Sequence, residues 1–248
     1  MASGRRSSHY TLVDLRNLCI PATPEIKKAL ALILATSIGP DGGINPSKDI
    51  EQSDVCINGM FLNYGCYFGT DEEKLRSVVD FIISQQLADG GFNCRLNRSG
   101  ARHSSMHSTI SVLEGIREYI AAGYAFRAEE LNRIEGEAQE FLLRHRLFKS
   151  DHTGAVIHPS FLKLVYPPRW RYDILRALDY FQSVGYPYDE RLQDALDILK
   201  EKRLSDGRWK TQAHHPGEVH FQMEQAGKPS RWSTLRCLRV LEYYDRDA

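Results

Sequence analysis

The residues best suited to chemistry are an aspartate, a cysteine and a histidine in the first half of the chain. Asp54 and Cys56 stand two positions apart, and His107 follows 51 residues after Cys56. Zinc takes carboxylate, thiolate and imidazole ligands, and a catalytic zinc site keeps its fourth position open. We expect the three side chains to hold zinc if the starts of two neighbouring helices bring them together. The alternative is that Asp54 and His107 cap helices and Cys56 is a small core residue.

A second set of candidates combines aromatic rings with guanidinium groups in the second half of the chain. Its members are Arg169, Trp170, Tyr172, Arg231 and Trp232. Aromatic rings can line a pocket for an apolar or cationic ligand, and arginines can meet an anionic group. The Arg-Trp pair recurs in two related segments, which favours a packing role for the tryptophans over a ligand site.

Three carboxylates allow a different chemistry. Asp173, Glu218 and Glu224 could supply a general acid and a general base, as in glycan-processing α/α barrels. The alternative is that they are solvated loop charges.

The elements that must position these residues show helical periodicity. Apolar residues spaced at i, i+3, i+4 and i+7 predict helices over 26–34, 75–83, 131–142 and 192–199. Thr23, a capping box of Thr70 with Glu73, and Asp189 are predicted to begin three of them. A second helix is predicted after each of the four, over 54–68, 105–122, 170–184 and 231–244.

Each first helix ends in a similar loop that contains aspartate and glycine. The loops contain Asp41, Asp89, Asp151 and Asp206, so the unit repeats about every 50 residues. Two helices per unit predict stacked helical hairpins, each of which needs its neighbours to bury its apolar face. We therefore expect an all-α fold of about four hairpins over residues 21–248. Residues 1–20 are predicted to be partly disordered and then helical.

These loops and helix starts resemble the prenyltransferase and squalene/terpene cyclase repeat superfamily. The run Gln85-Gln-Leu-Ala-Asp-Gly-Gly-Phe92 and its weaker copies carry the resemblance, which covers roughly residues 24–244. It implies an α/α toroid, here partial or small, with an apolar, isoprenoid-type ligand in a central cavity. The pattern of Asp54, Cys56 and His107 is similar to that of protein prenyltransferase β subunits. The resemblance implies that these three residues bind zinc, which activates the acceptor thiolate of a transferase.

The chain also departs from that superfamily. About four hairpins are fewer than a complete toroid of the family needs, so a homodimer that completes the ring is one expectation. The cyclases' Asp-x-Asp-Asp motif is missing from the sequence. A non-catalytic helical-repeat binding module therefore stays open as an alternative, as does a carbohydrate-active α/α barrel.

Composition narrows the remaining choices. Basic and acidic residues balance at 32 each, which argues against nucleic acid as the main partner. We expect no membrane span, because no apolar stretch approaches the roughly 18 residues that one requires. The five cysteines are odd in number and irregularly spaced. That pattern favours a reducing compartment, so we expect a cytoplasmic protein.

Overall fold

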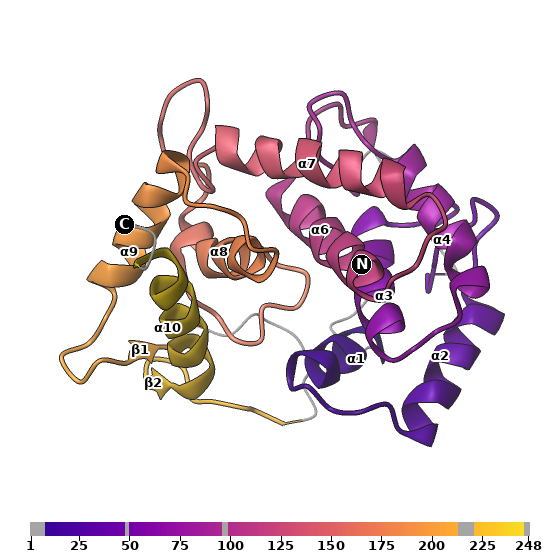
Figure 1. Cartoon of the computed structure of the whole chain (residues 1–248), viewed down its shortest axis with the longest axis horizontal. Helices are drawn as coiled ribbons and strands as arrows, with labels where there is room; N and C mark the ends of the chain where they lie inside the picture. The colour runs from indigo at the N-terminus through magenta and orange to yellow at the C-terminus, as the bar shows by residue number, and fades with distance from the viewer. Residues whose placement is uncertain (1–7, 48–49, 96–98, 213–220, 246–248) are drawn as a thin grey trace. The chain divides into compact units, whose positions relative to one another are not determined.

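A computed structural model describes residues 8–47, 50–95, 99–212 and 221–245 of the chain. Over these ranges the chain forms nine α-helices, two short 3-10 helices and one two-stranded ribbon (Figure 1). The predicted all-α class is therefore confirmed. The chain divides into two compact units, the first ending at Phe141 and the second beginning at Leu142.

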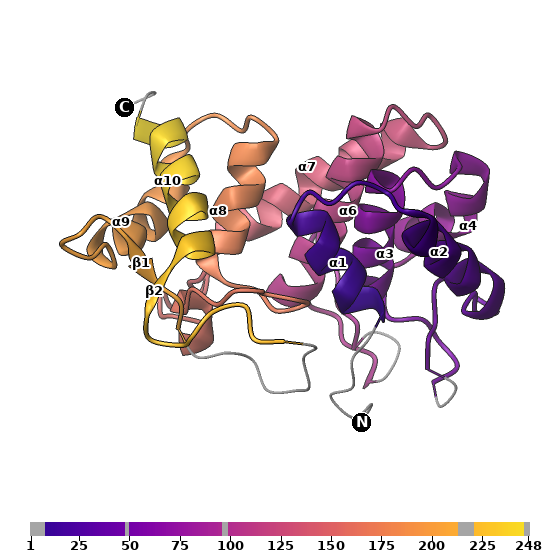
Figure 2. The ribbon, with the colours of Figure 1, turned by 90° about the horizontal axis from the view of Figure 1, so that it is seen from below.

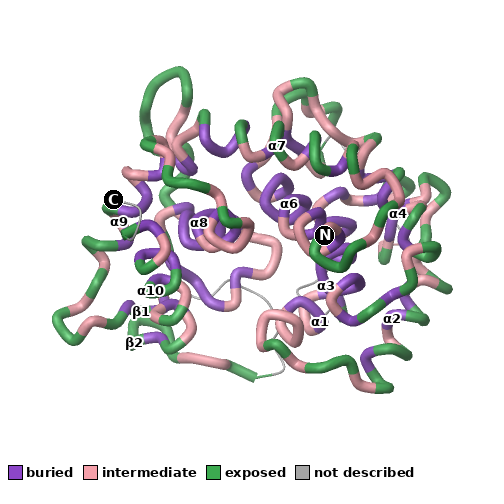
Figure 3. Tube along the Cα trace, in the orientation of Figure 1, coloured by how far each residue is buried: buried purple, intermediate pink, exposed green. Residues whose placement is uncertain are grey.

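The first unit is built around two central helices. Its elements are α1 (Ser8–Asn17), α2 (Pro24–Thr36), α3 (Val55–Tyr67), α4 (Glu72–Ser84), α6 (Met106–Ala121) and α7 (Ala128–Arg144), the last of which crosses the unit boundary. Helices α3 and α6 lie side by side, with the other helices around them (Figures 1 and 2). Both are buried along most of their length, as Figure 3 shows. They form the core of this unit.

Glycines allow α3 and α6 to approach each other closely. A Cβ added at Gly59 would lie 2.5 Å from the carbonyl oxygen of Ser111, and one added at Gly115 would lie 2.5 Å from the carbonyl oxygen of Gly59. Both contacts are with backbone, which cannot rotate away as a side chain can. The two helices are therefore held at a short separation where Gly59 meets residues 111–115.

The second unit pairs α8 with α10. Its elements are η1 (Pro159–Leu162), α8 (Ile174–Ser183), η2 (Glu190–Leu192), α9 (Gln193–Glu201), β1 (Trp209–Lys210), β2 (Pro229–Ser230) and α10 (Arg231–Asp245). The two strands form an antiparallel ribbon in which Trp209 pairs with Ser230. Asp179 of α8 accepts hydrogen bonds at 3.0 Å from Nε of Arg236 and from Nε of Arg239, both on α10. This ion cluster joins the two helices, with Asp179 and Arg236 largely buried and Arg239 half-exposed.

One contact recurs in three of the four hairpins. A side chain near the start of the second helix accepts the backbone N–H of the residue that follows the glycine loop. The pairs are Ile44 with Asn58 Oδ1 at 2.6 Å, Phe92 with Thr109 Oγ1 at 3.0 Å, and Trp209 with Thr234 Oγ1 at 3.0 Å. In each pair the residue after the turn has a side chain buried in the core, and a polar side chain accepts the hydrogen bond from its backbone N–H. The repeat predicted from the sequence is therefore visible as a repeated hydrogen bond.

Two of the three predicted helix starts are confirmed. The Thr23 hydroxyl accepts the Ile26 N–H at 3.3 Å and begins α2, and Asp189 accepts the Arg191 N–H at 2.8 Å and begins η2. The capping box of Thr70 and Glu73 is wrong. Thr70 is buried and lies one residue before the N-cap position of α4. The N-cap residue is Asp71, whose side chain makes no capping hydrogen bond.

The second helix of the third hairpin is shorter than predicted. It begins at Ile174 rather than near residue 170, because Asp173 caps it by accepting the Arg176 N–H at 2.8 Å. Residues 168–173 form a turn in which Arg169 has a left-handed backbone with φ of 54°.

In the part of the chain that the structure describes, no helix is both long enough and apolar enough to cross a membrane.

Candidate functional site

Cys56 and His107 occupy the same position in two successive hairpins of the first unit. Asp41 in the first glycine loop accepts the Ser53 N–H and hydroxyl, both at 2.7 Å. Asp89 in the second loop binds Ser104 in the same way, with the N–H at 2.8 Å. Cys56 lies three residues after the first serine and His107 three residues after the second. Each residue is therefore in the first turn of a central helix, α3 or α6.

A residue that the sequence did not single out lies at this point. The sulfur of Cys94 accepts the backbone N–H of Cys56 at 3.2 Å and the hydroxyl of Ser108 at 3.3 Å. The Ser108 hydroxyl also accepts the Cys94 N–H at 3.1 Å. The Cys56 side chain also lies close enough to the Cys94 thiol to lower the pKa of Cys94. Two half-buried thiols thus meet where the loop after Phe92 crosses the start of α3.

These contacts favour the thiolate form of Cys94. The largest effect on the pKa of Cys94 comes from the Cys56 side chain, which lowers it. Burial raises the pKa, and hydrogen bonds from the Ser108 hydroxyl and the Cys56 N–H lower it further. The negative charge of Asp54 acts in the opposite direction. By contrast, burial raises the pKa of the Cys66 thiol, which lies near the end of α3. Cys94 is therefore the more readily ionised of these two thiols.

Asp54 and Cys56 lie at the start of α3, and His107 lies in the first turn of α6. Asp54 is the N-cap residue of α3, but its carboxylate makes no capping hydrogen bond. His107 is half-buried, and its carbonyl accepts the Ser111 hydroxyl at 3.1 Å. Within the described ranges, no three His, Cys, Asp or Glu side chains are grouped so that they could hold a metal ion. The three donor types suit zinc. Because the side chains are not grouped, they would have to rotate at the two helix starts to hold the ion.

The five predicted ligand-binding residues all lie in the second unit. Trp232 stacks on Tyr166 with ring centroids 5.4 Å apart and an interplanar angle of 18°. The guanidinium of Arg171 lies 4.7 Å from the Trp170 ring centroid. Tyr172 is buried, and its hydroxyl donates to the Leu147 carbonyl at 2.5 Å. Tyr172 is thus a core residue, and Trp232 makes a packing contact of the kind that the repeat suggested.

The backbone N–H of Arg231 donates to Oε1 of Glu224 at 2.7 Å, and Glu224 also accepts the Ser230 hydroxyl. Glu224 therefore caps the start of α10. Asp173 caps α8 and is buried; burial raises its pKa to about 6, against the lowering effect of Arg236. Glu218 lies outside the described residues. Both described carboxylates therefore have structural partners.

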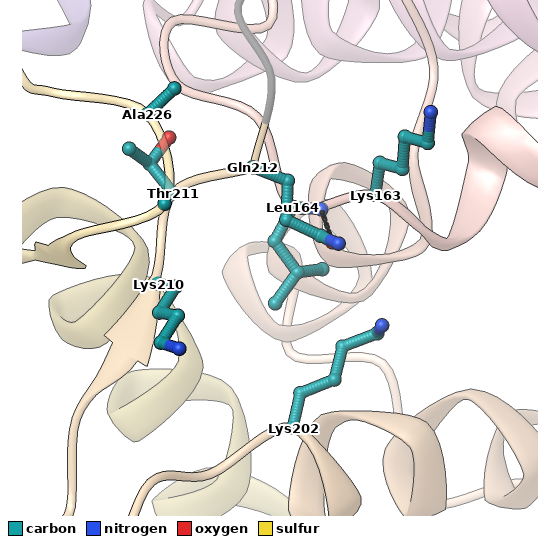
Figure 4. Close-up of a pocket in the computed structure, with 8 residues that line it drawn as sticks. Lys163, Leu164, Lys202, Lys210, Thr211, Gln212 and Ala226 are labelled. Atoms are coloured by element: carbon teal, nitrogen blue, oxygen red, sulfur yellow. Dashed lines mark hydrogen bonds between the residues drawn. The ribbon is translucent and has the colours of Figure 1, made fainter.

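A pocket of about 590 Å³ opens on the second unit. Its lining residues come from 163–164, 202, 210–212 and 226–227, and include the three lysines Lys163, Lys202 and Lys210 (Figure 4). Leu164 N–H donates to Oε1 of Gln212 at 2.8 Å across its wall. The five predicted ligand-binding residues are not among these lining residues. The lysine ammonium groups point in different directions in Figure 4, so they do not form a single anion site.

No protein-family model matches the chain, and a search of the curated proteins finds no significant match.

Proposed function

We propose that the protein is a prenyltransferase-like enzyme whose reacting centre lies at the starts of α3 and α6. Asp54, Cys56 and His107 would hold a zinc ion there. The proposal includes a partial α/α toroid of four hairpins, with an apolar, isoprenoid-type ligand bound against the starts of its inner helices. The observation that carries it is the equivalence of Cys56 and His107, each placed three residues after a serine that its own glycine loop binds.

The reaction class is transfer of an isoprenoid group from its diphosphate to a thiol. The acceptor sulfur forms a bond to the isoprenoid carbon, the carbon–oxygen bond to diphosphate breaks, and the thiol proton passes to solvent. Bound zinc supplies Lewis acidity that lowers the pKa of an acceptor thiol. The chain's own contribution is position, because the close packing at Gly59 and Gly115 holds α3 and α6, which carry these residues, against each other.

The experiment uses farnesyl diphosphate as the donor probe and dithiothreitol as the acceptor. Zinc-loaded protein is expected to form the thioether product, which is measured by liquid chromatography with mass spectrometry. Cys56→Ala should lower the rate at least about tenfold, because zinc loses its thiolate ligand. Cys19→Ala is the matched control, since Cys19 is exposed on the loop after α1 and should leave the rate unchanged. Product formation that is equal in Cys56→Ala and in the parent chain, or undetectable in the zinc-loaded parent, would overturn the proposal.

A further inference from the structure

The contact between Cys56 and Cys94 has chemistry of its own. Cys56 belongs to the first turn of α3, and Cys94 belongs to the loop that follows Phe92, 38 residues later. Two donors converge on the Cys94 sulfur: the Cys56 N–H at 3.2 Å and the Ser108 hydroxyl at 3.3 Å. The Cys94 sulfur is therefore held against the first turn of α3 by groups of both central helices.

The separation suits a disulfide. The Cys94 sulfur lies within about 4.7 Å of the Cys56 Cα, since the N–Cα bond adds about 1.5 Å to the measured 3.2 Å. A disulfide requires Cβ vectors that face each other and sulfurs that approach to about 2.05 Å. Because the Cys94 sulfur already lies this close to the Cys56 backbone, closing the gap requires side-chain rotation at two half-buried residues.

The other three cysteines have no such arrangement. Cys66 and Cys237 are buried, and burial raises the pKa of both thiols, so both stay protonated and are shielded from oxidants. Cys19 is exposed, and none of its described interactions is with another cysteine. Cys56 and Cys94 are thus the one pair among the five cysteines that the structure places in contact.

We propose that Cys56 and Cys94 form a reversible disulfide when the protein meets a peroxide. Cys94, whose sulfur accepts the Cys56 N–H and the Ser108 hydroxyl, attacks first as the thiolate. It attacks one oxygen of hydrogen peroxide, the O–O bond breaks, and the released hydroxide takes a proton to become water. Cys56 then attacks the sulfenic sulfur, the S–O bond breaks, and a second water leaves. In total, two thiols and one peroxide give one disulfide and two waters, and a dithiol reductant reverses the change.

The disulfide would remove a zinc ligand. This consequence rests on the proposed function, because Cys56 is the thiol assigned to zinc there. Oxidation would then release the metal and stop the transfer reaction, and reduction would restore both. The disulfide itself depends only on the contact between the two thiols.

The test treats the full chain, reduced and freed of metal by a chelator, with hydrogen peroxide at low molar excess. Free thiols are expected to fall from five to three, with the mass of two hydrogens lost and then regained on treatment with dithiothreitol. Peptide mapping should locate the bond between Cys56 and Cys94. Cys94→Ser and Cys56→Ser should each abolish it, whereas Cys19→Ser should leave it intact.

Two outcomes overturn the proposal: five free thiols after treatment, or a bond that maps to any other pair. A parallel sample loaded with zinc separates this proposal from the proposed function. Slower oxidation in the zinc-loaded sample supports both. Equal oxidation with and without zinc contradicts the assignment of Cys56 to the metal and leaves the disulfide standing.

Discussion

At the residue scale, the first unit shows how burial decides which side chains can carry charge. His9 of α1 is buried, and its Nδ1 lies 2.5 Å from the hydroxyl of Tyr64 on α3. Burial lowers the pKa of His9 from 6.5 to about 4 and raises the pKa of Tyr64 well above its usual value. The tyrosine therefore stays protonated, and its hydroxyl donates a hydrogen bond to the neutral imidazole. This pair joins the first helix to the core of its unit.

The pair predicts a pH dependence of stability. Folding favours the neutral form of His9, so its contribution is complete above pH 6.5 and is lost as the pH falls towards 4. The loss from this group is expected to reach about 3 kcal/mol. Urea unfolding of the parent chain and of His9→Gln at pH 7 and pH 4.5 measures it. The parent should lose more free energy of unfolding than the variant does over that interval.

His152→Gln is the control, because the His152 side chain is 90% exposed. It should follow the parent at both pH values. A His9→Gln variant that loses as much stability as the parent between pH 7 and pH 4.5 would show that His9 is not held neutral.

At the element scale, the sequence predicted the eight helices of the four hairpins, because apolar periodicity and glycine loops are local signals. Two features could not be predicted in this way. The thiol of Cys94 reaches α3 only because α3 and α6 pack, and that packing depends on contacts 51 residues apart, such as Asn63 Nδ2 with the Glu114 carbonyl at 3.0 Å. The late start of α8 depends on the buried Asp173 that caps it, whereas its sequence context suggested a solvated charge.

The close approach of α3 and α6 makes Gly59 sensitive to substitution. Alanine has a higher helix propensity than glycine by about 1 kcal/mol, but its Cβ at Gly59 would lie 2.5 Å from a backbone oxygen. We expect the clash to win and Gly59→Ala to destabilise the protein by about 1–3 kcal/mol. Denaturant unfolding measures the change.

Gly136→Ala is the matched control in α7, because a Cβ there meets no atom within 4 Å. It should stabilise the protein by up to about 1 kcal/mol. If both variants shift the free energy of unfolding in the same direction, the result would contradict the close backbone contact at Gly59.

At the scale of the whole molecule, the chain divides into two compact units, and the single hairpin-repeat domain over residues 21–248 stays a prediction. The sequence showed no linker, because the boundary falls inside α7, where the helical pattern continues without a break. Separate cores predict that damage in one unit stays there.

Asp179→Ala tests this separation. It removes the carboxylate that Arg236 and Arg239 share, and leaves Arg236, 12% exposed, without that partner. Loss of one member of such a cluster is expected to cost about 3 kcal/mol. Hydrogen exchange followed by mass spectrometry should show faster exchange in α8 and α10 and unchanged exchange in α3 and α6.

Asp206→Ala is the control, because its pair with Arg208 is exposed and contributes less than about 1 kcal/mol. Faster exchange in α3 and α6 of Asp179→Ala would show that the two units unfold together.

The most direct test of the central proposal is the zinc content of the purified protein, measured by inductively coupled plasma mass spectrometry after zinc is supplied and excess metal is removed. The proposed site predicts about one zinc per chain, lost in the Cys56→Ala, His107→Ala double variant and retained in Cys19→Ala. A chain that binds no zinc under these conditions, or a double variant that binds as much as the parent, would contradict the assignment of Asp54, Cys56 and His107.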